Sequence, residues 1–221
     1  MIFTPSPNFD DRKAPVEMLV LHYTGMKTTQ EAINRLRDPV AKVSAHYLID
    51  EDGEVYSLVD EDKRAWHAGV SFWKGKTDIN SRSVGIEIVN PGHEFGYRPF
   101  PSNQIQSIIN TSKEIIKRYA LLLENVVGHS DIAPTRKKDP GELFPWKKLA
   151  ENGIGLWTDE FATPEKSVAE MLSAIGYDTT DEQAALTAFQ RRFYPEAFLN
   201  QASDTVRRLA AVSNLYEKGI K

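Results

Sequence analysis

The segment from Met18 to Leu21 constrains the fold more than any other part of the chain. It is an unbroken apolar run, Met-Leu-Val-Leu, and His22 follows it directly. A strand that is apolar on both faces has to be covered on both faces, which is typical of the sheets of α/β proteins. We therefore predict a buried central strand that presents His22 at its tip.

The segments around this strand alternate between helical and extended patterns. Thr28 with Glu31 three positions later predicts a capped helix start, and Asp38-Pro39 predicts the end of that helix. A turn at Asp52-Gly53 predicts a hairpin with strands at 46–49 and 55–59. A further strand is predicted at 84–89, and a long amphipathic helix from Ser102 or Asn103. These interleaved elements predict a mixed α/β fold, with a central sheet flanked by helices, that ends near residue 157.

The chain beyond residue 157 has a purely helical pattern. Helix starts are predicted at Thr163-Pro164, at Thr180 and at Ser203, and Gly176 is predicted to close the first helix. Each helix carries an apolar stripe, which predicts a small three-helix bundle. The sequence therefore predicts two domains, at 1–157 and 158–221.

The composition is that of a folded globular protein and excludes several classes of function. Hydrophobic residues make up 41% of the chain, and the net charge of -4 leaves no broad basic field, which argues against nucleic acid as a partner. Without cysteine, any metal must be held by His, Asp or Glu. No apolar run approaches the length of a membrane span, and the N-terminal segment lacks the apolar core of a signal peptide. We therefore expect a cytoplasmic protein. The alternative is a mature periplasmic protein whose leader peptide has been removed.

A second histidine lies in the segment 126–141. Two valines predict a strand end just before His129, and Asp139 stands in a Pro-Gly turn with Lys137 close by. Each residue alone is most simply structural, a hydrogen-bonded histidine or a turn-forming aspartate. Together with His22, however, they supply two imidazoles and one carboxylate. That is the ligand set of a catalytic zinc, whose fourth position stays open for water.

Several other motifs in the chain accompany these residues, and together they resemble those of a known family. In order along the chain they are Leu21-His22-Tyr23-Thr24, Val43-Ser44-Ala45-His46-Tyr47-Leu48-Ile49, Ala65-Trp66-His67-Ala68-Gly69, Ser83-Val84-Gly85-Ile86-Glu87 and Gly128-His129-Ser130-Asp131-Ile132-Ala133-Pro134. The region from Pro15 to Trp146 closely resembles the zinc-dependent N-acetylmuramoyl-L-alanine amidases of the type 2 family, in the AmpD and AmiD branch.

The resemblance implies one Zn²⁺ per chain, bound by His22, His129 and Asp139. It also implies that Glu87 is the general base and that Lys137 stabilises the tetrahedral intermediate, roles that agree with the chemistry of amide hydrolysis. The bond cleaved would join the lactyl group of N-acetylmuramic acid to L-alanine. The substrate would be peptidoglycan or its muropeptide fragments.

Strand alternation alone does not predict a catalytic position for Glu87. It puts Val84, Ile86 and Ile88 on one face and Glu87 on the other, which favours a solvent-facing carboxylate. The resemblance reverses this expectation. Many phage and animal members of the family have a cysteine where this chain has Asp139.

The resemblance also suggests residues that contact substrate. Trp66 and His67 lie in a loop expected to border the substrate groove, and Asn80 and Arg82 are candidate contacts for stem-peptide carboxylates, with an ordinary loop role as the alternative. His46 is predicted to be a packed, hydrogen-bonded histidine and not a ligand.

The C-terminal segment resembles a peptidoglycan-binding domain of the three-helix type, on the evidence of residues 185–193. Phe189 and Phe193 in that stretch are predicted to be core residues. The alternative function is a peptidoglycan-recognition protein without activity. The choice between soluble 1,6-anhydro-muropeptides and polymeric wall stays open, as does the oligomeric state.

Overall fold

A mixed six-stranded sheet forms the centre of the molecule. The computed structural model describes residues 1–199 and 204–218. The strands run in the order β1 (Ile2–Phe3), β5 (Val55–Ser57), β4 (Tyr47–Ile49), β7 (Ser83–Ile88), β3 (Met18–Tyr23) and β8 (Val126–Gly128). All neighbours pair in parallel except β4 and β5, which form the predicted hairpin. A separate antiparallel pair joins β2 (Phe9–Asp11) to β6 (Lys63–Ala65). The predicted mixed α/β class is confirmed.

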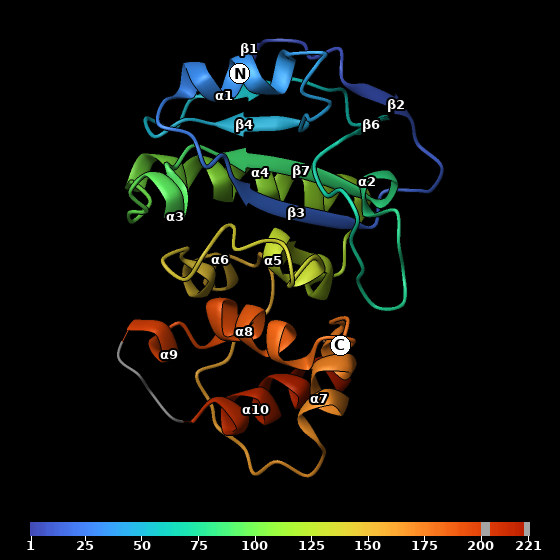
Figure 1. Cartoon of the computed structure of the whole chain (residues 1–221), viewed down its shortest axis with the longest axis vertical. Coiled ribbons are helices and arrows are strands. Elements are labelled where there is room, and N and C mark those ends of the chain that lie inside the picture. The colour runs from blue at the N-terminus through green and yellow to red at the C-terminus, as the bar shows by residue number, and fades with distance from the viewer. Residues whose placement is uncertain (200–203, 219–221) are drawn as a thin grey trace.

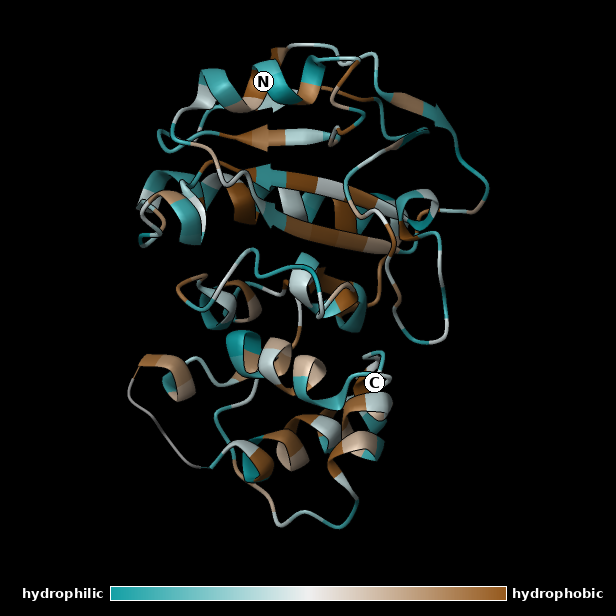
Figure 2. Cartoon of the chain, viewed as in Figure 1, coloured by the Kyte–Doolittle hydropathy of each residue, from teal (hydrophilic) through white to brown (hydrophobic). Residues whose placement is uncertain are grey.

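The central strand β3 is buried on both faces, as its apolar run predicts. Leu19 and Leu21 belong to one apolar cluster, whereas Met18 and Val20 belong to another on the opposite side of the sheet. Figure 2 shows most of this strand in the brown of hydrophobic residues. The alternation follows from the two-residue period of a strand, so that a continuous apolar run serves two separate cores.

The first cluster is closed by the long helix α4 (Ser102–Tyr119), which lies behind the sheet in Figure 1. The helix α1 (Thr29–Arg37) begins as predicted, because the Thr28 side chain accepts a hydrogen bond from the Glu31 backbone N–H. The shorter helices of this part are α2 (Ile79–Arg82), α3 (Gly92–Phe95), α5 (His129–Ile132), α6 (Trp146–Glu151) and a 3-10 turn at Leu123–Asn125.

The C-terminal helices close the second cluster, together with α5, which lies between them and the sheet (Figure 1). They are α7 (Val168–Ile175), α8 (Glu182–Phe193), the short α9 (Glu196–Leu199) and α10 (Thr205–Lys218). Phe189 and Phe193 are fully buried, as predicted. The side chains of β3 and of the C-terminal helices therefore share one core, although the predicted boundary at 157/158 falls in the coil between α6 and α7.

Two predicted helix starts in this region are wrong. The first helix is capped by Ser167 and not by Thr163, because the Ser167 hydroxyl accepts from the Glu170 backbone and the Glu170 carboxylate accepts in return. The second is capped by Asp181, one residue after the predicted Thr180. The third predicted start, Ser203, lies outside the described residues. Gly176 ends α7 as predicted, with its backbone in the left-handed region.

In the part of the chain that the structure describes, no helix combines the length and the apolar character needed to cross a bilayer.

The shared core predicts that the two parts of the chain unfold together. Phe189→Ala should lower the free energy of unfolding by about 3–5 kcal/mol, because it empties a site between α8 and the sheet. The control Leu122→Ala, at a side chain 62% exposed, should change it by less than ~0.5 kcal/mol. Urea denaturation followed by circular dichroism and by tryptophan fluorescence provides the measurement. Two separate transitions, of which Phe189→Ala shifts only one, would contradict a common core.

Candidate metal and catalytic site

Strand register brings the predicted site residues to one edge of the sheet. His22 of β3 pairs with Glu87 of β7, and Leu21 pairs with Gly128, the residue before His129. The three strands are parallel, so their carboxyl ends meet at this edge. His129 follows β8 directly, as predicted, but it begins the helix α5 and does not enter a loop.

Three candidate ligand atoms converge at this edge. The Nδ1 atoms of His22 and His129 lie 2.9 Å apart, and Oδ2 of Asp139 lies 3.0 Å from the Nδ1 of His129 and 3.2 Å from that of His22. All three side chains are buried. Zinc bonds of about 2.0–2.2 Å in tetrahedral geometry separate neighbouring ligand atoms by about 3.3 Å. The donor set and its spacing therefore fit a single zinc ion.

The protonation of this cluster supports the same role. Burial alone would raise the pKa of Asp139, but the neighbouring imidazoles outweigh it and hold that pKa well below the usual range. Burial and the adjacent His129 lower the pKa of His22 to about 4. Near neutral pH the site thus offers a carboxylate and a neutral His22 ring, and metal ligands have to be deprotonated.

A chain of hydrogen bonds orients the His22 ring from behind. Its Nε2 lies 3.0 Å from Nδ1 of His67, whose Nε2 lies 3.2 Å from the Ser83 hydroxyl, and that hydroxyl donates to the Ile79 carbonyl at 2.7 Å. The terminal carbonyl can only accept, so each ring donates through Nε2 and keeps Nδ1 as an acceptor. This leaves Nδ1 of His22 directed at the candidate metal site with its lone pair available.

Gly85 makes the position of His67 possible. A Cβ at Gly85 would lie 2.5 Å from Cγ of the His67 ring, so a larger residue would displace it. His46 packs nearby and accepts a hydrogen bond from the Gly85 backbone N–H at 2.9 Å. His46 is thus a packed, hydrogen-bonded residue, as predicted.

The ring of Tyr97 anchors the segment that carries Asp139. Its hydroxyl donates to the Pro140 carbonyl at 2.7 Å and accepts from the Leu143 backbone N–H at 3.0 Å. Gly141, with a backbone φ of +88°, packs so closely on this ring that an added Cβ would lie 2.3 Å from the hydroxyl. Tyr97 therefore holds the segment that follows Asp139 by two hydrogen bonds and by close packing.

Glu87 faces the cavity and not bulk solvent, contrary to the expectation from strand alternation alone. Its Oε2 has no hydrogen-bond partner among the described residues. Burial, and then the charge of Asp139, raise the pKa of Glu87 well above its usual range, with Lys137 opposing them. An unpartnered carboxylate with a raised pKa is suited to accept a proton.

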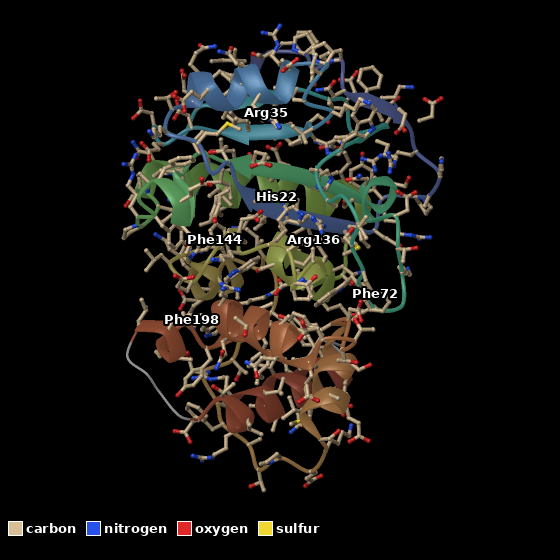
Figure 3. The ribbon with its side chains drawn as sticks, viewed as in Figure 1. His22, Arg35, Phe72, Arg136, Phe144 and Phe198 are labelled. Carbon is tan, nitrogen blue, oxygen red and sulfur yellow. The ribbon has the colours of Figure 1, made fainter. Side chains whose placement is uncertain are left out.

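A cavity of about 590 Å³ connects these groups. Trp66, His67, Glu87 and Lys137 line it together with His129 and Asp139. The remaining lining is a mixture of apolar, polar and charged side chains, and it includes basic and aromatic residues that sequence reasoning did not assign to the site: Tyr23, Arg35, His93 and Arg136. Figure 3 shows His22 on the sheet, with Arg136 on the segment that follows α5. Tyr23 and Arg136 adjoin predicted site residues in sequence, which is the one signal that could have indicated them.

Two of the candidate substrate contacts have other partners. The Asn80 side-chain oxygen accepts from the backbone N–H groups of His67 and Ala68, at 3.0 and 2.7 Å, so Asn80 holds the loop beside the candidate metal site. Arg82 pairs with Glu17 at 2.8 Å. Neither Asn80 nor Arg82 is among the described residues that line the cavity.

Comparisons with known proteins agree with this geometry. The profile of a protein family described as N-acetylmuramoyl-L-alanine amidase matches residues 12–142. The N-acetylmuramoyl-L-alanine amidase AmiD of Escherichia coli K12 is 36% identical over 226 residues, covering 88% of this chain and 81% of AmiD. The 1,6-anhydro-N-acetylmuramyl-L-alanine amidase AmpD of Enterobacter cloacae is 42% identical over 107 residues, covering 48% of this chain and 55% of AmpD.

Solved structures show the same relationship. A complex of E. coli AmiD with anhydro-N-acetylmuramic acid-L-Ala-D-gamma-Glu-L-Lys has a TM-score of 0.78 at 37% identity, covering 92% of this chain and 89% of that one. AmpDh3 from Pseudomonas aeruginosa has a TM-score of 0.80 at 35% identity, covering 92% of each chain. The protein therefore belongs to the N-acetylmuramoyl-L-alanine amidase family and is of the AmpD and AmiD type.

Proposed function

We propose that this protein is a zinc-dependent hydrolase that cleaves the amide bond between N-acetylmuramic acid and L-alanine. The observation that carries the proposal is the meeting of a zinc-compatible donor set with Glu87 and Lys137 in one cavity. Family membership supports the activity. A recognition protein without activity is not favoured, because the predicted ligands and both catalytic candidates are present together.

Glu87 would act as the general base. A bound Zn²⁺ would polarise the lactyl carbonyl and lower the pKa of the attacking water. Glu87 then takes one proton from that water as its oxygen attacks the carbonyl carbon. The carboxyl group holds this proton in a buried environment that stabilises its neutral form, and donates it to the alanine nitrogen as the C–N bond breaks.

Lys137 would stabilise the oxyanion that forms on the lactyl carbonyl. Its ammonium group can donate to that oxygen from the loop that follows α5. The backbone N–H of Lys137 donates to the Ala133 carbonyl at 3.0 Å. This anchoring fixes the loop before substrate arrives, so little reorganisation is needed during the reaction.

The substrate class we propose is muropeptides, including those with a 1,6-anhydro sugar. Structures of AmiD and AmpDh3 contain anhydromuramic peptides, and the AmpD name specifies the anhydro sugar. Trp66 at the cavity wall would offer an apolar surface to glycan or peptide. Binding of polymeric wall by the C-terminal helices stays a prediction.

Metal content and activity test the function together. The purified protein should contain about one zinc per chain, release free L-Ala peptide from an anhydro-muropeptide, lose this activity on chelation, and regain it when zinc is restored. Intact sacculi assayed in parallel decide between soluble and polymeric substrate. Muropeptide binding without turnover at full zinc occupancy would instead establish a recognition protein.

Substitutions should separate the base from the ligands. Glu87→Gln should lower kcat by about 10²–10⁴ while zinc content is unchanged, because Glu87 contributes a proton transfer. Asp139→Asn should lose the metal itself. Glu114→Gln, at an exposed position of α4, is the matched control and should retain both properties. Full zinc retention in Asp139→Asn would remove Asp139 from the ligand set.

His67 provides a test between two roles. If it orients His22, His67→Leu should weaken zinc binding by about 10–100-fold, and His67→Gln, whose side-chain oxygen can still accept from Nε2 of His22, should weaken it less. The KM at saturating zinc should change little in both variants. A raised KM with unaltered zinc affinity would favour the substrate contact that the sequence resemblance implies.

A further inference from the structure

One arginine of the C-terminal helices reaches the segment that presents His129. Arg192, near the end of α8, is 1% exposed, and its guanidinium donates to Oδ2 of Asp131 at 2.6 Å and to the Val126 carbonyl at 2.7 Å. Val126 precedes His129 on β8, and Asp131 follows it in α5. A single side chain therefore contacts the chain on both sides of a candidate ligand.

The carboxylate of Asp131 joins these contacts into one cluster. Its Oδ2 also accepts from the Gly128 backbone N–H at 2.7 Å, and its Oδ1 accepts from the Tyr177 hydroxyl at 2.7 Å. Gly128 is the residue directly before His129, and Tyr177 lies between α7 and α8. The corner where β8 turns into α5 is thus fixed by a carboxylate whose two other donors come from α8 and from the connection between α7 and α8.

The same guanidinium also packs against the chain that follows Asp139. Its carbon lies 4.4 Å from the ring centre of Trp146, the first residue of α6, and 4.7 Å from that of Phe193. A Cβ at Gly128 would lie 2.8 Å from Cδ of Pro140 and 3.2 Å from the Trp146 ring. The corner before His129 and the turn after Asp139 therefore pack directly on each other.

Ordinary packing does not require this arrangement. The apolar residues of α8 already fill the core between the helices and the sheet, and an apolar side chain at position 192 would extend that core. A buried ion pair adds little to stability compared with such packing, but it fixes the relative positions of the groups that it joins. Here those groups are α8 and the segment that carries His129, and the same guanidinium also packs on Trp146 in the chain that follows Asp139.

We propose that Arg192 is a positioning residue for the metal site, acting through Asp131, so that the C-terminal helices set the affinity for zinc. The proposal rests on the zinc site of the proposed function. It assigns to these helices a part in building the catalytic centre, separate from any binding of wall polymer.

Zinc affinity of the full-length protein tests this directly. Arg192→Met leaves a side chain of similar length without charge, and it should weaken zinc binding by about 10–100-fold in a competition titration with a chromophoric chelator. Arg192→Lys keeps the charge without the two-pronged donor and should give an intermediate dissociation constant.

Arg208 of α10 supplies the matched control. It is also buried, donates to the Thr158 carbonyl and lies 4.4 Å from the ring centre of Phe161, outside the metal-site segment. Arg208→Met should lower the thermal midpoint but leave the zinc dissociation constant within about twofold of the wild-type value. A folded Arg192→Met protein that binds zinc as tightly as Arg208→Met would overturn the proposal.

A milder variant covers the case in which Arg192→Met does not fold. Tyr177→Phe keeps the ring and removes only the hydroxyl that Asp131 accepts from, and it should weaken zinc binding severalfold with the circular dichroism spectrum unchanged. Unchanged affinity in Tyr177→Phe and in Arg192→Lys would equally overturn the proposal. If the wild-type protein itself fails to bind zinc, the proposed function fails and this inference fails with it, whereas tight wild-type binding with unaltered variants refutes this inference alone.

Discussion

The parallel pairing of β3 with β7 on one side and β8 on the other is the constraint on which the site depends. It places His22 opposite Glu87 and aligns Leu21 with Gly128, so that His129 comes next at the same edge. A slip of one residue would turn His22 into an apolar cluster and Leu21 toward the cavity. Because the run from Met18 to Leu21 is apolar on both faces, the polar His22 at its end is what distinguishes this register, and the same register brings the candidate catalytic groups together.

The side chains that support the candidate ligands and the carboxylate of Glu87 differ in their hydrogen bonding. Side chains that support the ligands have partners: His67 bridges His22 and Ser83, and Asp131 accepts from three donors. Oε2 of Glu87 has none among the described residues. A buried acceptor without a partner costs free energy, and such a cost is typically retained where a reaction needs the group. Substrate or water in the cavity would supply the hydrogen-bond partner that Oε2 of Glu87 lacks.

Local patterns predicted much of the fold, and long-range contacts account for what they missed. The apolar run of β3, the Thr28 cap and the hairpin turn each depend on neighbours in sequence, so a single sequence shows them. The contact of His67 with His22 depends on strand pairing and on the space left by Gly85, which no periodicity reveals. The site residues themselves were indicated by motifs of a known family, and spacing alone would not have joined His22 to Asp139.

The burial of Arg192 is likewise set by long-range contacts that the sequence does not reveal. On a helix that ends in Arg-Arg-Phe, either arginine would pass for a solvated residue or a favourable charge near the helix end. Only the packing of α8 on β8 and α5 buries one of them beside Asp131. Because the apolar faces of these helices cover the sheet, any wall polymer would have to bind their outward polar residues. The interface between the C-terminal helices and the sheet would then both cover the sheet and shape the proposed metal site. A substitution that alters the packing there would therefore also alter the geometry of the site.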